Sequence, residues 1–240
     1  MESINISEVK HTSPFFKQGT QACVYHDKKY AYKLYKLNDK NMLMFHTMDV
    51  DYQLEKLSRI NVDSYVTPKF SIKDDRGHIR GYGMDYIKGK TLNRLNMNVN
   101  INKFIDDLKK LEEDTYKISE EKYKLRDRND RNFLYTSEDG FKLIDLDYGI
   151  FDPHKSTDEI NRHNIGFIKD ILIASVFGIG LFDKLGTSDH ELTTCLHKND
   201  SLTDFIEYIE KDVNKEKVLI KDIRRKKNDL IVTKNYYGHY

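Results

Sequence analysis

Oxygen-bearing side chains that can bind a divalent metal gather between residues 124 and 149, in the stretch KLRDRNDRNFLYTSEDGFKLIDLDYG. Asp127 and Asn132 are five residues apart in a segment typical of a loop, and Asp145 follows a short apolar run thirteen residues after Asn132. A β-hairpin between Asn132 and Asp145 would return the chain and let these two side chains face each other. Carboxylate and amide oxygens are hard ligands that suit magnesium rather than zinc. Asp127 then remains to orient or deprotonate a hydroxyl, and the set suits phosphoryl transfer.

The composition restricts the class of protein. In 240 residues, 40 Lys and Arg stand against 39 Asp and Glu, so there is no overall charge to favour nucleic acid or a membrane surface. Cys23 and Cys195 lie far apart without a CxxC pair, which argues against a zinc site or a disulfide scaffold. The N-terminus does not resemble a signal peptide, and the apolar stretch 167–182 is too short to span a bilayer. We therefore expect a cytoplasmic protein with no membrane partner.

The first ninety residues are typical of a small antiparallel sheet with one helix. Residues 23–26 and 30–36 flank the turn DKK as two strands would, and residues 67–73 and 79–87 flank DDRG in the same way. Between these hairpins, the apolar residues of 48–60 recur at helical spacing.

The remainder of the chain is mainly helical. Apolar residues between Ile101 and Leu111 recur at the spacing of an amphipathic helix, and helical patterns continue from Glu159 onward. The hairpin expected over residues 133–145 interrupts them. The composition changes near residue 88, so the sequence predicts an α+β chain with a strand-rich lobe over 1–88 and a helical lobe over 89–240.

Three motifs in the strand-rich part resemble those of protein kinases. The stretch QGTQACVY resembles a glycine-rich loop, with Gly19 at its second glycine and Val24 at its valine, and YAYK resembles the strand motif V-A-I-K. The resemblance implies that Lys33 pairs the α- and β-phosphates of ATP. The stretch GYGMDYIKGKTL resembles the strand and hinge that bind adenine, which implies contacts from the backbone of Asp85 and Ile87.

Two further motifs complete the resemblance, which covers roughly residues 13–180. LRDRNDRN resembles H-R-D-x-x-x-x-N, with Asp127 as the catalytic aspartate and Asn132 as a metal ligand, and FKLIDLDYG resembles the strand that leads into the metal-binding aspartate. We prefer Asp145 as that ligand, although Asp147-Tyr148-Gly149 can also be aligned with D-F-G. The chain thus resembles the protein-kinase-like superfamily, which implies a two-lobed fold that binds ATP and Mg²⁺.

The sequence departs from the family at several positions. Leu125 replaces the histidine of H-R-D, and the short distance from Asp145 to the next helix leaves no room for a long activation segment. No clear glutamate is available in the helix before Pro68 to pair with Lys33. Asp51 is the first choice for this partner, while Gln53 and Glu55 stay open.

The resemblance implies an atypical bacterial or phage-type serine/threonine protein kinase that acts on a protein substrate. Two alternatives stay open: a small-molecule kinase of the aminoglycoside or choline type, favoured by the form IDLD, and a pseudokinase that serves as a binding module. The charged groups expected on the phosphates are all present, which favours an enzyme over the binding module. The sequence does not name the substrate or the oligomeric state.

Overall fold

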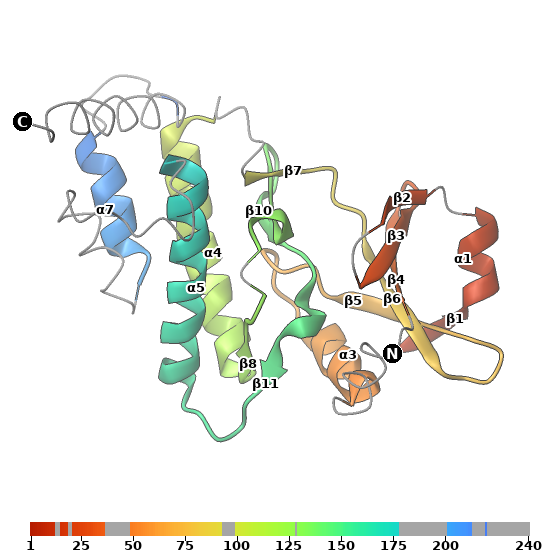
Figure 1. Cartoon of the computed structure of the whole chain (residues 1–240). Coiled ribbons are helices and arrows are strands. Elements are labelled where there is room, and N and C mark those ends of the chain that lie inside the picture. Colours follow the sequence, from red (N-terminus) through yellow and green to blue (C-terminus); the bar gives the residue numbers. More distant parts are fainter. Residues whose placement is uncertain are drawn as a thin grey trace, which may run out of the picture.

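The computed structural model describes residues 1–12, 15–18, 21–36, 49–92, 99–127, 129–177, 201–212 and 219. It is an α+β protein, as the sequence predicts. Figure 1 shows the largest sheet at one end of the molecule and the long helices at the other, with short strands between them.

The largest sheet has six strands in the order β1-β5-β6-β4-β3-β2. Both hairpins expected from the sequence are present as β3–β4 and β5–β6, and every neighbouring pair is antiparallel except β1–β5. The strands are β1 (Glu2–Asn5), β2 (Phe15–Gln18), β3 (Ala22–His26), β4 (Tyr30–Tyr35), β5 (Pro68–Lys73) and β6 (Ile79–Asp85).

The prediction of a purely antiparallel sheet with one helix was wrong in two respects. Strand β1 pairs in parallel with β5, in the register Glu2↔Phe70, and it leads directly into helix α1 (Ile6–Thr12). The strand has only four residues and the helix only seven. Such short segments show little periodicity, and β1 exists because a strand almost seventy residues later offers it an edge.

The two faces of the sheet pack against different helices. Alternation along β4 sends Ala31, Lys33 and Tyr35 to the face covered by helix α3 (Val50–Arg59), whose Leu54 joins their apolar cluster. The opposite face packs against Val9 of α1. Lys33 therefore lies on the inner face, toward the rest of the protein.

The helical part has one continuous core. It lies between α4 (Ile101–Glu120), α5 (Thr157–Phe177) and α7 (Thr203–Asp212), and it contains the apolar face predicted for α4. Within the described helices, none is long and apolar enough to cross a membrane. The apolar stretch 167–182 is helical up to residue 177, and its last five residues, 178–182, lie outside the described part.

Short strands and turns connect these two parts and carry the residues of interest. The predicted hairpin is present as β9 (Phe133–Thr136) and β10 (Gly140–Leu143), with β7 (Lys90–Thr91) beside β9. A second ribbon joins β8 (Tyr123–Lys124) to β11 (Ile150–Phe151). One-turn 3₁₀ helices, η2 (Asp130–Asn132) and η3 (Leu146–Tyr148), lie next to these strands.

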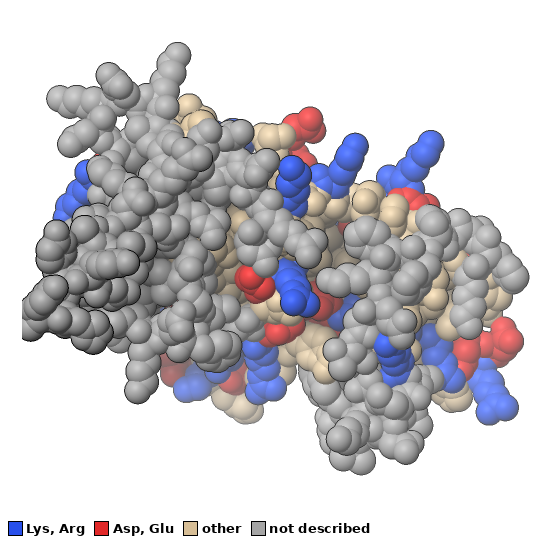
Figure 2. All heavy atoms as spheres, turned by 45° about the horizontal axis from the view of Figure 1, so that its top comes forward, with Lys and Arg blue, Asp and Glu red and all other residues tan. Residues whose placement is uncertain are grey.

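The charged surface is mixed. On the face seen in Figure 2, basic and acidic side chains alternate over the described part of the chain. This agrees with the near-equal numbers of the two kinds of charge in the sequence.

Candidate active site

Lys33 lies at the centre of the candidate site. Its ammonium group ion-pairs with Asp145 and, at 2.8 Å and 3.1 Å, with the two carboxylate oxygens of Asp147. Only 6% of its side chain is exposed. Burial lowers the pKa of Lys33, but Asp147 and Asp145 outweigh this effect and leave the pKa above its usual value. The lysine is therefore a buried cation that was brought to these carboxylates across more than a hundred residues of sequence.

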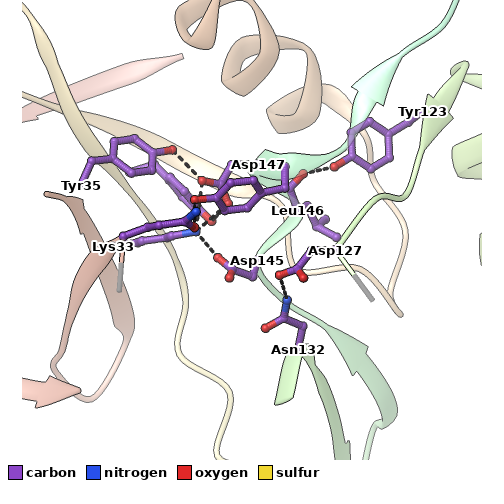
Figure 3. Close-up of polar contacts among 11 residues, drawn as sticks. Lys33, Tyr35, Tyr123, Asp127, Asn132, Asp145, Leu146 and Asp147 are labelled. Carbon is purple, nitrogen blue, oxygen red and sulfur yellow. Dashed lines mark hydrogen bonds and ion pairs between the residues drawn. The ribbon is translucent and has the colours of Figure 1, made fainter. Parts of the chain in front are cut away.

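Asp147 is held on all sides by donors. Tyr35 donates to its Oδ2 at 2.9 Å and Tyr82 to its Oδ1 at 3.1 Å, in addition to the two contacts from Lys33 (Figure 3). Burial by itself would raise the pKa of Asp147. Lys33 and the two tyrosine hydroxyls lower the pKa by a larger amount, so it lies below its usual value. Asp147 is thus a buried carboxylate in its charged form.

Asp145 has a different environment from that of Asp147. Its side chain is 27% exposed, and burial together with the nearby Asp147 raises its pKa to about 6 in spite of Lys33. Its backbone is left-handed, with φ 66° and ψ 44°. Within the described residues only Lys122 shares a positive φ among those that are not glycine. Such backbone strain is found often at functional sites, where the surrounding structure enforces it.

The hairpin brings Asp145 next to Asn132, as the spacing predicts. The amide of Ile144 donates to the carbonyl of Asn132 at 2.9 Å, which joins the end of β10 to η2. The side-chain Nδ2 of Asn132 donates to Oδ2 of Asp127 at 2.7 Å. Asp127, Asn132 and Asp145 also line one common pocket. The three residues chosen from the sequence therefore lie together, below Lys33 in Figure 3.

Two residues of α5 that the sequence did not single out for this purpose hold the loop of Asp127. The amide of Leu125 donates to the side-chain oxygen of Asn164 at 2.9 Å, and its carbonyl lies 2.8 Å from Nε2 of His163. Both contacts are made to the backbone and not to the side chain of residue 125. The sequence offers no signal for them, because the contacts span about forty residues.

Tyr123 supports the segment of Asp145 and Asp147 from the other side. Its hydroxyl donates to the backbone carbonyl of Leu146, and its ring is fully buried against Gly149. The centre of the Tyr148 ring lies 5.0 Å from the ammonium group of Lys33, and the Tyr148 hydroxyl donates to Gln21. Segment 145–149 is therefore joined both to the helical part and to the sheet.

Two of the residues assigned to the nucleotide base, Val24 and Asp85, lie on the same sheet as Lys33, and Ile87 follows the end of β6. Val24 is the cross-strand partner of Lys33, and Ala31 is the partner of Met84. Ile87 packs on the apolar cluster that contains Ala31 and Met84. Asp85 is exposed at the end of β6, where it ion-pairs with Lys69 at 3.4 Å. Gly19 lies outside the described residues.

The expectation that helix α3 supplies the partner of Lys33 was wrong. Leu54 and Leu57 turn toward the core, and this orientation leaves Asp51 and Glu55 exposed on the outer side. Glu55 ion-pairs with Arg59 instead, at 2.6 Å. Gln53, the third candidate, is half-buried and carries no charge. The carboxylates that pair with Lys33 come from the segment after β10.

The donor set fits magnesium held jointly by protein and phosphate. Within the described ranges, no three His, Cys, Asp or Glu side chains cluster as a self-contained metal site. Magnesium is usually bound by one or two protein groups together with water and phosphate oxygens, so such a cluster is not required. Asn132 uses its Nδ2 on Asp127, so its Oδ1 is the atom that would contact a metal, and Asp145 has a partly exposed carboxylate.

Two comparisons with known proteins were made on the sequence. No protein-family model matches the sequence, and no curated protein matches it. The geometry of the site, together with the sequence motifs that predicted its residues, is therefore the basis for a function.

Proposed function

We propose that the protein is an ATP- and magnesium-dependent phosphotransferase with a two-lobed, protein-kinase-like fold, and that it phosphorylates Ser or Thr of a protein. One observation carries the proposal. Lys33, Asp145 and the pair of Asp127 and Asn132 were selected from three separate motifs, and they lie together: Lys33 ion-pairs with Asp145, and Asp145 shares a pocket with Asp127 and Asn132. These are the groups that phosphoryl transfer uses. A chance match of motifs does not predict that convergence.

The roles follow from charge and position. Lys33, on the inner face of the sheet, would bind the α- and β-phosphates of ATP. Asp127 would accept the proton of the substrate hydroxyl, and because Asn132 donates to its Oδ2, the other carboxylate oxygen would take that proton. Asn132 and Asp145 would hold magnesium, which neutralises charge on the β- and γ-phosphates when bound. ATP would place its base against Val24, Asp85 and Ile87.

The partners of Lys33 indicate which contact changes when ATP binds. Asp145 is partly exposed, whereas Asp147 is 7% exposed and fully hydrogen-bonded. Asp145 would therefore be the residue that can leave Lys33 to hold magnesium, while Asp147 would keep its ion pair with the lysine.

A small-molecule kinase is the second candidate, because the chain has little between its metal segment and the next helix. Strand β11 ends at Phe151, and α5 begins at Thr157. An extended segment that cradles a peptide does not fit between these residues. Transfer of the γ-phosphate of ATP to a general protein acceptor, compared with transfer to a panel of aminosugars and amino-alcohols, distinguishes the two.

The proposal is tested with purified protein and ATP labelled at the γ-phosphate. We expect magnesium-dependent transfer to an acceptor that is lost in Asp127→Ala. An Asp127→Ala variant as active as the parent would refute the assigned roles. A parent that shows neither transfer nor any nucleotide-dependent rise in melting temperature would instead favour a binding module without catalysis.

A further inference from the structure

We infer that Asp147 is the positioning residue for the phosphate-binding lysine, and that it takes the place of a carboxylate from helix α3. This inference rests on the proposed function, because it assigns a task to Lys33 that only a nucleotide site requires. It concerns a residue whose part in the site the sequence left open.

The contacts of Asp147 suit positioning better than metal binding. Both of its carboxylate oxygens receive a bond from Lys33, and each receives another from a tyrosine hydroxyl, Tyr35 or Tyr82. A carboxylate with both oxygens engaged and 7% exposure has little capacity left for an incoming ion. Asp145, two residues earlier, is the more exposed of the pair. Asp147 would thus hold Lys33, and Asp145 would bind the metal.

The three groups that donate hydrogen bonds to Asp147 all lie on the large sheet. Tyr82 is the cross-strand partner of Lys33, and Tyr35 lies two residues after Lys33 on the same face of β4. All three donors therefore come from adjacent strands and converge on one point. Asp147 reaches that point from η3, so it joins the metal-binding segment to the sheet (Figure 3).

Helix α3 offers no competing carboxylate among its described residues. Its inner side is formed by Leu54 and Leu57, and Asp51 and Glu55 are exposed. No carboxylate of α3 therefore pairs with Lys33, whose ion-pair partners Asp145 and Asp147 both come from the segment after β10. Helix α3 packs on the same face of the sheet through Leu54, so it contributes apolar packing to the site and not charge.

A double-mutant cycle between Asp147 and Lys33 tests the inference. The apparent affinity for Mg-ATP and the KM for ATP are measured for the parent, Asp147→Asn, Lys33→Met and the double variant. Because contacting residues couple, we expect Asp147→Asn to weaken ATP binding about tenfold in the parent and to add nothing when Lys33 is already absent. A purely structural role would give the same loss in both backgrounds.

Glu55→Gln is the matched control, because it removes a carboxylate from α3 by the same chemical change. We expect its KM for ATP to equal that of the parent. If Asp147→Asn fails to fold, as judged by circular dichroism, the Tyr35→Phe and Tyr82→Phe pair replaces it, since this change removes two donors to Asp147 and keeps the ion pair between Asp147 and Lys33. That pair should also raise the KM for ATP, and only while Lys33 is present.

The outcomes separate this inference from the proposed function. An active parent whose ATP affinity is unchanged in Asp147→Asn, or reduced equally in both backgrounds, overturns the inference and leaves the function standing. A larger effect in Glu55→Gln than in Asp147→Asn overturns it as well. A parent that neither binds ATP nor transfers phosphate overturns both.

Discussion

Replacing Gly149 by alanine should destabilise the protein through a collision inside the candidate site. A Cβ at this position would lie 2.1 Å from the hydroxyl oxygen of Tyr123, 2.2 Å from its Cζ and 2.8 Å from the carbonyl oxygen of Lys124. Tyr123 is fully buried, so its ring cannot swing into solvent. The carbonyl of Lys124 belongs to the β8–β11 ribbon and moves only if that ribbon distorts.

The size of the effect follows from two contributions. Overpacking a buried site costs about 1–3 kcal/mol. Moving the Tyr123 ring also breaks its bond to the carbonyl of Leu146, and a buried acceptor without a partner costs about 1–3 kcal/mol. At roughly 4 kcal/mol in total, and about 2–4 °C per kcal/mol for a chain of this size, we expect the melting temperature to fall by about 8–16 °C.

Thermal unfolding followed by circular dichroism measures this shift. Gly77→Ala is the matched control, because Gly77 has a φ of +80° but nothing within 4 Å of a Cβ. The control should therefore cost only about 1–2 kcal/mol, from backbone strain alone. If Gly149→Ala melts no lower than Gly77→Ala, the packing of Tyr123 against Gly149 does not limit this segment and the reasoning fails.

Three other predictions concern the charged groups. Asp127→Ala should reduce phosphate transfer by about 10²–10⁴-fold in a radiolabel assay while the magnesium-dependent thermal shift with ATP persists, and loss of that shift would show a binding role instead. ATP at a hundredfold excess over its Kd should stabilise the parent by about 2.7 kcal/mol in total, and Asp145→Asn should remove the part of this stabilisation that requires magnesium. A full shift in the variant would exclude Asp145 as the ligand. Burial by itself would raise the pKa of Asp74 above its ordinary 3.8. Hydrogen bonds from His78 and Arg80 have the larger effect and lower the pKa to about 2. The carboxylate therefore stabilises the fold above about pH 4, and this stabilisation is lost toward pH 2. Asp74→Asn should lower the melting temperature at pH 7 and not at pH 2, and an equal difference at both pH values would contradict this.

Local pattern predicted much of the fold. The hairpins β3–β4, β5–β6 and β9–β10 were recognisable because each places apolar runs on both sides of a short polar turn. Helix α4 was recognisable from the repeat of its apolar residues. In both cases the residues that decide the structure are close in sequence.

Contacts between distant segments were not predictable in this way. Strand β1 depends on an edge offered by β5, and the loop at Leu125 depends on Asn164 and His163 of a helix about forty residues later. The residues adjacent in sequence to β5 or to Asn164 and His163 do not indicate these distant contacts. The prediction of an α3 carboxylate beside Lys33 failed for the same reason, because only packing decides which side of a helix faces the sheet.

At the candidate site, some residues could be selected from the sequence, whereas the role of one residue depended on the tertiary structure. Residue type and spacing were enough to select Asp127, Asn132 and Asp145, because their oxygen atoms suit magnesium and a short hairpin returns the chain between Asn132 and Asp145. Lys33 was selected through the resemblance of YAYK to a kinase strand motif. The task of Asp147 could not be read from IDLD, in which two aspartates look alike. Only the tertiary structure distinguishes them, since it buries one among Lys33 and two tyrosine hydroxyls and leaves the other partly open to solvent. Burial and hydrogen bonding, which depend on segments more than sixty residues away, determine what each carboxylate can do.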